Sequence, residues 1–200
     1  MEKIILASAS PRRRELLEQI GLEFDIVVST DSEENIDKTL PPDIYTAELA
    51  IFKATSVAKK LNELGRKNCI IIAADTIVYH DGNILGKPKN KSDAVNMLKA
   101  LSGNCHEVYT GICVMRLDDG FMVSKSVKSD VYFKVLTDEM INAYINTREY
   151  TDKAGAYGIQ GMGAVLVDKI EGDYFNIVGL PLSALYDVLT NEFNFDVFSV

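Results

Sequence analysis

Short apolar runs alternate with helical patterns along this chain of 200 residues, and no other feature constrains its fold more. A continuous apolar run of about five residues is typical of a buried strand, whereas apolar residues three and four positions apart indicate an amphipathic helix. A chain that alternates the two patterns packs helices against a sheet. The sequence therefore predicts an α/β protein whose mixed, elongated β-sheet is flanked by helices.

The apolar runs give the expected strands. We expect strands at residues 3–7, 24–28, 69–73, 108–117, 121–136, 165–170 and 174–178, and a small hairpin that joins residues 77–79 to 84–85. Three of the connections carry Asp-Gly or Gly-Asp pairs, which favour tight turns between antiparallel strands. Residues 108–117 and 121–136 are therefore expected to form one hairpin, and residues 165–170 and 174–178 another.

Capping residues mark the expected helices. The first begins after Ser10 with Pro11 in its first turn, the second covers residues 46–64, and the others begin at Ser92, Thr137 and Pro181. The chain is long enough for one hydrophobic core, so we expect one domain over residues 1–200, with or without a smaller lobe.

Charge and cysteine content narrow the class of protein. The formal net charge of −8 argues against binding to nucleic acid through its backbone phosphates, which requires a basic face. Cys69, Cys105 and Cys113 show no metal-ligand spacing and are expected to be buried thiols in a reducing compartment. No signal-peptide pattern or membrane-length apolar stretch occurs, so a cytoplasmic location is expected.

Arginines gather at the start of the first predicted helix, as Arg12, Arg13 and Arg14. Free backbone N–H groups give a helix N-terminus partial positive charge, so cations are unusual there. Arg12 and Arg13, with the hydroxyl groups of Ser8 and Ser10, are therefore predicted to bind phosphate oxygens. The alternative is a solvated basic patch in which Ser10 is only a helix cap.

A lysine and an aspartate lie next to apolar segments. Lys53 is in line with the apolar stripe of helix 46–64, where its ammonium either extends to solvent or enters a substrate site. Asp75 is expected at the end of the buried strand 69–73, where α/β proteins gather functional groups. We predict that Asp75 is a general base that deprotonates water near a divalent cation, with the Thr76 hydroxyl beside it.

Two loops supply further candidates. Lys87, held between Gly86 and Pro88, either binds phosphate or belongs to a charged surface turn. Glu33 and Glu34 lie in an acidic loop and are candidates, with Asp75, to bind Mg²⁺ or Mn²⁺, which prefer oxygen ligands. His80 and His106 fall in hairpin or strand contexts, so neither a histidine metal site nor a Ser-His-Asp triad is expected.

Four glycines fall within nine residues, at positions 155, 158, 161 and 163. Glycine is unfavourable in regular elements, so this segment is expected to turn sharply or to approach a ligand closely. Asp152 and Lys153 either pair with each other or line the substrate site. Gln160 carries both a donor and an acceptor, which matches the hydrogen-bonding edge of a pyrimidine.

Together, the segments at residues 8–13, 74–76, 86–88 and 152–161 resemble the motifs of the Maf family of nucleoside triphosphate pyrophosphatases. The glycine-rich segment resembles the branch that cleaves dTTP and UTP. The resemblance extends from Ile4 to about Ala184, and the spacing between the motifs is consistent with it.

The resemblance implies a fold related to that of inosine triphosphatase, with a central nucleotide cleft, and a homodimer that uses a divalent cation. The implied reaction is hydrolysis of dTTP and UTP, and of modified pyrimidine nucleotides, to the monophosphate and pyrophosphate. Asp75 matches the family's proton acceptor, Arg12, Thr76 and Gln160 match positions linked to base preference, and either Glu33 or Glu34 matches the metal-linked acid.

Two other classes of function compete with this interpretation. The Maf name is associated with cell division and septum formation, so the alternative is a nucleotide-sensing regulator with little turnover. A nucleic-acid-binding module is disfavoured by the net charge. Continuous pyrophosphate release would distinguish an enzyme from a sensor.

Overall fold

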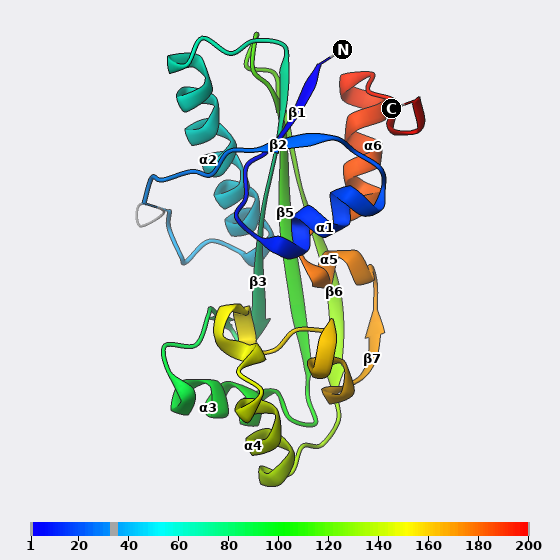
Figure 1. Ribbon diagram of the computed structural model, residues 1–200. Helices are drawn as coiled ribbons and strands as arrows, with labels where there is room; N and C mark the ends of the chain where they lie inside the picture. Colours follow the sequence, from blue (N-terminus) through cyan, green and yellow to red (C-terminus); the bar gives the residue numbers. More distant parts are fainter. Residues whose placement is uncertain (1, 33–35, 200) are drawn as a thin grey trace. The chain divides into compact units, whose positions relative to one another are not determined.

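The computed structural model describes residues 2–32 and 36–199. Seven strands form one mixed sheet in the order β2-β1-β3-β5-β6-β7, and β4 pairs with β3 (Figure 1). Helices accompany the strands along the chain, so the predicted mixed α/β class is confirmed.

The strands are β1 (Lys3–Leu6), β2 (Phe24–Ile26), β3 (Cys69–His80), β4 (Asn83–Leu85), β5 (Cys105–Arg116), β6 (Met122–Phe133) and β7 (Val167–Glu171). The α-helices are α1 (Pro11–Gln19), α2 (Pro42–Glu63), α3 (Lys91–Leu101), α4 (Asp138–Asn146), α5 (Tyr174–Val178) and α6 (Leu182–Phe193). Short 3₁₀ turns are η1 (Glu149–Asp152), η2 (Ala154–Ala156), η3 (Gly161–Leu166) and η4 (Val197–Ser199).

The sheet is mixed because only its first strands run in the same direction. β1 is parallel to both β2 and β3, and Ile5 pairs with Asp25 on one side and Ile71 on the other. β5 runs against β3, since Leu117 N donates to the Cys69 carbonyl at one end. β4 and β7 are antiparallel to β3 and β6 respectively, so the predicted hairpin at residues 77–85 is confirmed.

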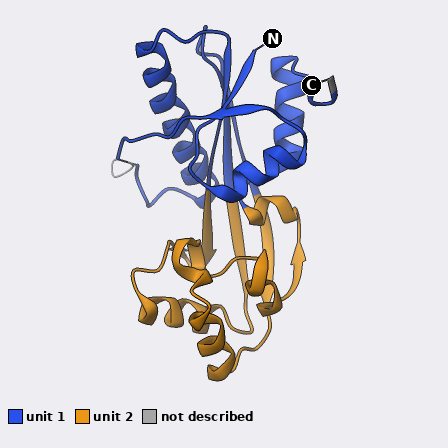
Figure 2. Cartoon of the chain, in the orientation of Figure 1, with its two compact units in different colours: residues 1–75, 110–127, 179–200 blue, residues 76–109, 128–178 orange. Residues whose placement is uncertain are grey.

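The chain divides into two compact units that are interleaved along the sequence (Figure 2). Unit 1 contains residues 1–75, 110–127 and 179–200, and unit 2 contains residues 76–109 and 128–178. The long strands β3, β5 and β6 each contribute one part to each unit.

Helix α2 covers one face of the strands in unit 1. Alternate side chains of β3 point toward it, and they share a buried cluster with small and apolar residues of the helix: Cys69, Ile71, Ala73, Ala50, Ala54, Val57 and Leu61. The helix approaches the sheet closely at Gly111 of β5. A Cβ atom at Gly111 would lie 2.2 Å from the Thr46 carbonyl oxygen, so only glycine fits there.

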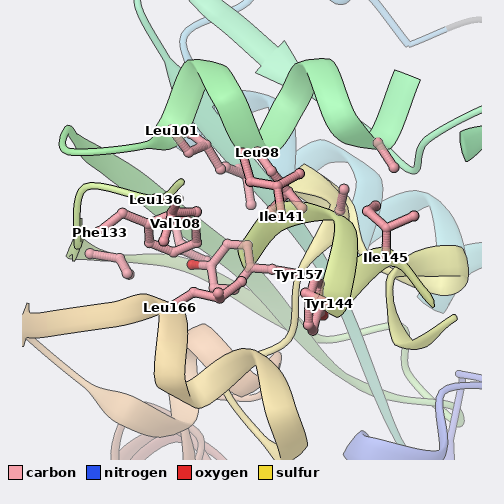
Figure 3. Close-up of a cluster of buried hydrophobic side chains, with 14 residues drawn as sticks. Leu98, Leu101, Val108, Phe133, Leu136, Ile141, Tyr144, Ile145, Tyr157 and Leu166 are labelled. Carbon is pink, nitrogen blue, oxygen red and sulfur yellow. The ribbon is translucent and has the colours of Figure 1, made fainter. Parts of the chain in front are cut away.

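Unit 2 has its own core, in which α3, α4 and the glycine-rich segment meet (Figure 3). Tyr157 is buried in this core, and its ring lies edge-on to Phe133 and His106. The Tyr157 hydroxyl is 2.8 Å from His106 Nε2. Burial, with a smaller contribution from His80, lowers the pKa of His106 to about 3. The core therefore holds a neutral histidine that is bound to the glycine-rich segment.

One predicted strand is wrong. Residues 174–178 form helix α5, not the second strand of a hairpin with β7. Asp173 explains the difference, because its Oδ1 accepts a hydrogen bond from Phe175 N at 2.8 Å and so caps the helix. The short helix directs Asn176 into the interior, where its Nδ2 donates to the Val108 carbonyl at 3.0 Å.

Two smaller expectations also need correction. Helix α3 is capped by Asn90, not Ser92, because the Asn90 side chain has the spacing needed to accept from Asp93 N at 2.9 Å. Cys69 and Cys113 are buried free thiols as predicted, but Cys105 is exposed. It is the first residue of β5, where the strand has just emerged from a turn.

The helices of the described residues include none that is both long enough and apolar enough to cross a membrane.

Gly111→Ala should destabilise the protein by about 3 kcal/mol or more, because the new methyl group meets backbone that cannot move aside. We expect the melting temperature to fall by about 6–12 °C. Gly86→Ala is the control, since no atom lies within 4 Å of a Cβ there. Equal melting temperatures for the two variants would contradict the close approach of α2 to β5.

His106 should make stability fall as the pH is lowered. Its folded-state pKa of about 3 is below the ordinary histidine pKa of 6.5, so the unfolded state takes up a proton first as the pH falls. Between about pH 6.5 and 5 the free energy of unfolding should fall by up to about 1.4 kcal/mol per pH unit for this group. The free energy of unfolding, measured with urea at several pH values in that range, should depend less steeply on pH in His106→Gln than in the wild type. An equal pH dependence in the two proteins would exclude His106 as the source.

Candidate functional site

Strand alternation brings Lys53 and Asp75 together in unit 1. Asp75 follows Ile71 and Ala73 on the face of β3 that is covered by α2, so its carboxylate points toward the helix. Lys53 lies beside Ala54 on α2, and its Nζ forms an ion pair with Asp75 Oδ1. The two side chains are only 16% and 17% exposed, so the pair is mostly shielded from water.

The sequence predicted Asp75 at the end of its strand. This prediction is wrong, because β3 continues to His80. The parallel neighbour β1 ends earlier, with Leu6 opposite Ile72. Asp75 therefore lies just beyond the carboxyl end of β1, on the part of β3 that β1 no longer covers. Functional groups gather at such positions in α/β sheets.

The segment that follows β1 is organised by Arg13. The Arg13 side chain is buried, and it donates from Nε to the Gly179 carbonyl at 2.8 Å and from Nη1 to Ser8 Oγ at 3.1 Å. Ser8 Oγ also accepts from Ser10 N at 3.2 Å. Ser8, Ser10 and Arg13 are thus brought together, and part of the guanidinium of Arg13 binds the protein itself.

The other two arginines of α1 differ from Arg13 and from each other. Arg12 is half-buried, whereas Arg14 is exposed and pairs with Glu18 at 2.8 Å on the surface of the helix. Ser10 occupies the N-cap position, as predicted, but its side chain makes no capping hydrogen bond. The Ser10 hydroxyl therefore does not serve the helix.

In unit 2, the loop of Lys87 lies against the glycine-rich segment. The Gly86 carbonyl accepts a hydrogen bond from Gly155 N at 3.1 Å, and Lys87 is exposed next to it. The two motifs at residues 86–88 and 152–161, which are distant in sequence, are therefore neighbours in the fold.

Thr76 follows Asp75 in β3 and is half-buried.

The glycines of this segment allow close contacts within the segment itself. Gly155 and Gly161 have φ values of +67° and +69°, the left-handed region that glycine adopts without strain. A Cβ atom at Gly163 would lie 2.2 Å from the Gly158 carbonyl oxygen, and one at Gly158 would lie 2.7 Å or less from the Lys153 side chain. Sharp turning is confirmed, and the close approach is made by the chain's own atoms.

Asp152 and Lys153 pair with each other, at 2.8 Å between Oδ1 and Nζ, which was one of the two expected arrangements. Lys153 Nζ also donates to the carbonyl of Glu149. Gln160 is half-buried and stands immediately before η3.

The structure adds residues that sequence reasoning missed. The Glu149 carboxylate accepts hydrogen bonds from Met162 N at 3.0 Å and Gly163 N at 3.3 Å. His106 and Tyr157 anchor the same segment from the core. No motif marks these contacts, because each joins the glycine-rich region to a residue distant in sequence, and the spacing between the two follows no helical or strand period.

A complete metal site is absent from the part of the chain that the structure describes, where no three His, Cys, Asp or Glu side chains gather. Glu33 and Glu34 lie outside the described residues. Asp75, the third predicted metal ligand, lies within the described residues, and one of its oxygens is bound by Lys53.

Known proteins resemble this chain over nearly all of its length. The profile of the family described as Maf-like protein matches residues 3–192. A dTTP/UTP pyrophosphatase of Thermoanaerobacter sp. (strain X514) is 52% identical over 192 residues, which cover 96% of this chain and 97% of that protein. A dTTP/UTP pyrophosphatase of Clostridium novyi (strain NT) is 50% identical over 186 residues, or 93% of this chain and 95% of that protein.

Among solved structures, a HAM1 protein from Coxiella burnetii is similar with a TM-score of 0.45 and 17% identity, over 66% of this chain and 73% of that one. The family match and the identity to the sequence relatives, which cover the chain almost from end to end, establish that this protein belongs to the Maf family.

Proposed function

We propose that this protein is a dTTP/UTP pyrophosphatase, which hydrolyses the nucleoside triphosphate to the monophosphate and pyrophosphate. The observation that carries the proposal is a sequence identity of 49–52%, over almost the whole chain, to several relatives that bear this name. The shielded Lys53–Asp75 pair supports it, since it holds a carboxylate, a group that can accept a proton from water, in a fixed and mostly shielded position.

Asp75 is proposed as the general base. Its carboxylate takes a proton from water as the water oxygen forms a bond to phosphorus, and the bridge between the α and β phosphates breaks to release pyrophosphate. Lys53 holds the carboxylate in one orientation through the ion pair. A base in a fixed orientation typically accelerates such a step by about 10²–10⁴-fold.

Basic and hydroxyl groups are proposed to bind the phosphates. Phosphoryl transfer depends mainly on positioning and on neutralising spread negative charge. Arg12 and Lys87 are the proposed direct contacts, with the hydroxyl groups of Ser8 and Ser10. Arg13 is proposed to bind phosphate with the part of its guanidinium that faces away from Gly179 and Ser8.

A divalent cation is part of the proposal. Mg²⁺ usually takes one or two protein carboxylates and completes its shell with water and substrate phosphates, so a site with few acidic side chains fits it. Asp75 is one proposed ligand, and Glu33 or Glu34 is the other. The bound cation would neutralise phosphate charge.

The glycine-rich segment is proposed to recognise the base. Gln160 can donate to a carbonyl oxygen of uracil or thymine and accept from N3–H, whereas cytosine offers the reverse pattern there. Thr76 is proposed to add a hydroxyl contact. Asp152 and Lys153, which pair with each other, are proposed to line this part of the site.

Family membership and the sequence support three broader properties of the protein, which we propose with its activity. The chain acts as a single domain, it forms a homodimer, and it works in the cytoplasm. Modified pyrimidine nucleotides are further proposed substrates.

Asp75→Asn should lower kcat by at least about 10²-fold with nucleotide affinity largely kept, because the amide can still accept from Lys53 but cannot take the proton. Pyrophosphate release and nucleotide binding should be measured on the same preparation. Asp187→Asn, at an exposed position of α6, is the control and should match the wild type. A near-normal kcat for Asp75→Asn would exclude Asp75 as the base.

The unmodified protein should prefer UTP and dTTP over CTP and ATP in kcat/KM, and Gln160→Leu should reduce that preference by about tenfold or more. The change removes the donor and acceptor that read the base, so inhibition by tripolyphosphate, which has no base, should persist. Gln19→Leu, at the exposed end of α1, is the control. An unchanged substrate ranking in Gln160→Leu would separate this residue from base recognition.

A further inference from the structure

The turn that carries Gln160 closes on itself. Gly158 and Gly163 lie so close that a Cβ atom at Gly163 would meet the Gly158 carbonyl oxygen at 2.2 Å and the Gly158 nitrogen at 3.1 Å. Gln160 stands between these two glycines in the sequence. Its position therefore depends on what keeps this turn, residues 158–163, closed.

One support comes from the end of helix α4. This helix is anchored in the unit 2 core by Ile141, Tyr144 and Ile145 (Figure 3). Thr147 follows it and accepts a hydrogen bond from Glu149 N at 3.2 Å. The backbone of Glu149 is thus held in place next to a helix that is packed into the core.

The Glu149 side chain reaches across to the turn. Its Oε2 accepts from Met162 N and its Oε1 from Gly163 N, at 3.0 and 3.3 Å. A carboxylate that accepts from backbone N–H groups makes stronger hydrogen bonds than a neutral acceptor. Gly161 leaves room for it, because a Cβ atom there would lie 3.0 Å from both carboxylate oxygens.

A second support holds the other side of the turn. Tyr157 is buried and hydrogen-bonded to His106, and Gly155 N donates to the Gly86 carbonyl. Gln160 is therefore three residues after one anchor and two residues before the next. Its side chain makes no hydrogen bond that caps η3, and the anchored backbone fixes the position from which the side chain extends.

We propose that Glu149 is a positioning residue for base recognition, whose carboxylate closes turn 158–163 and so holds Gln160 in the orientation that reads the pyrimidine. This inference rests on the proposed function, because it assumes that Gln160 reads the base. Glu149 is not among the residues proposed to bind the phosphates or to accept the proton.

The test compares Glu149→Ala and Glu149→Gln with the wild type. In Glu149→Ala the ratio of kcat/KM for UTP to that for CTP should fall about tenfold, since the turn loses both acceptors. The inhibition constant for tripolyphosphate should stay within about twofold, because phosphate binding is untouched. Glu149→Gln keeps one acceptor oxygen and should lose a smaller part of the preference.

Asp168→Ala removes a negative charge at an exposed position of β7 and is the matched control, with an unchanged ratio expected. The inference is overturned if Glu149→Ala keeps the wild-type ratio, or if activity on every substrate and tripolyphosphate affinity fall together. Should Glu149→Ala not fold, the ratio for the isosteric Glu149→Gln decides, and an unchanged ratio there overturns the inference.

Hydrogen exchange separates this inference from the function on which it rests. The amides of Met162 and Gly163 should exchange at least about tenfold faster in Glu149→Ala, because their acceptor is gone, while the core amides of α4 keep their protection. A wild type that does not prefer UTP and dTTP would defeat the proposed function. Unchanged exchange at these two amides would defeat the role of Glu149 whatever the substrate.

Discussion

The side-chain alternation of β3 is the constraint on which much of unit 1 depends. Cys69, Ile71 and Ala73 must face α2 to bury their apolar groups. Because side chains alternate with a period of two along a strand, Asp75 must then face α2 as well. A carboxylate on a buried face is costly unless a cation and hydrogen bonds satisfy it. Lys53 meets that requirement from α2, which contributes Ala54 and Val57 to the same cluster. The Lys53–Asp75 ion pair is thus a consequence of core packing.

Regular elements could be predicted because their signals are local. The apolar run at the start of β3 predicted a buried strand, and Thr137 does cap α4, accepting from Met140 N at 3.3 Å. The same approach failed at residues 174–178, where an apolar composition suited to a strand is overridden by the cap at Asp173 and by the buried hydrogen bonds of Asn176. Local propensity is a weak prior beside such tertiary contacts.

The candidate site, too, could be predicted only in part from the sequence. Lys53 and Asp75 could be predicted individually, since each stands out against apolar periodicity, but their pairing needed the relative placement of α2 and β3. The glycine spacing indicated a tight turn, yet it could not show that the close partners are Lys153, Glu149 and the turn's own carbonyl. Contacts between irregular segments leave no period in the sequence, so Glu149 carried no signal.

The interleaving of the two units has a consequence for the order in which the protein can be completed during synthesis. All of unit 2 lies within residues 76–178, so every segment it needs has been made before α6 exists. Unit 1 needs residues 179–200, and the bond from Arg13 to the Gly179 carbonyl joins residues 166 positions apart. The segment that follows β1 therefore cannot reach its final form until residues 179–200 have been made, and until then Arg13 lacks the Gly179 carbonyl that helps to order its side chain.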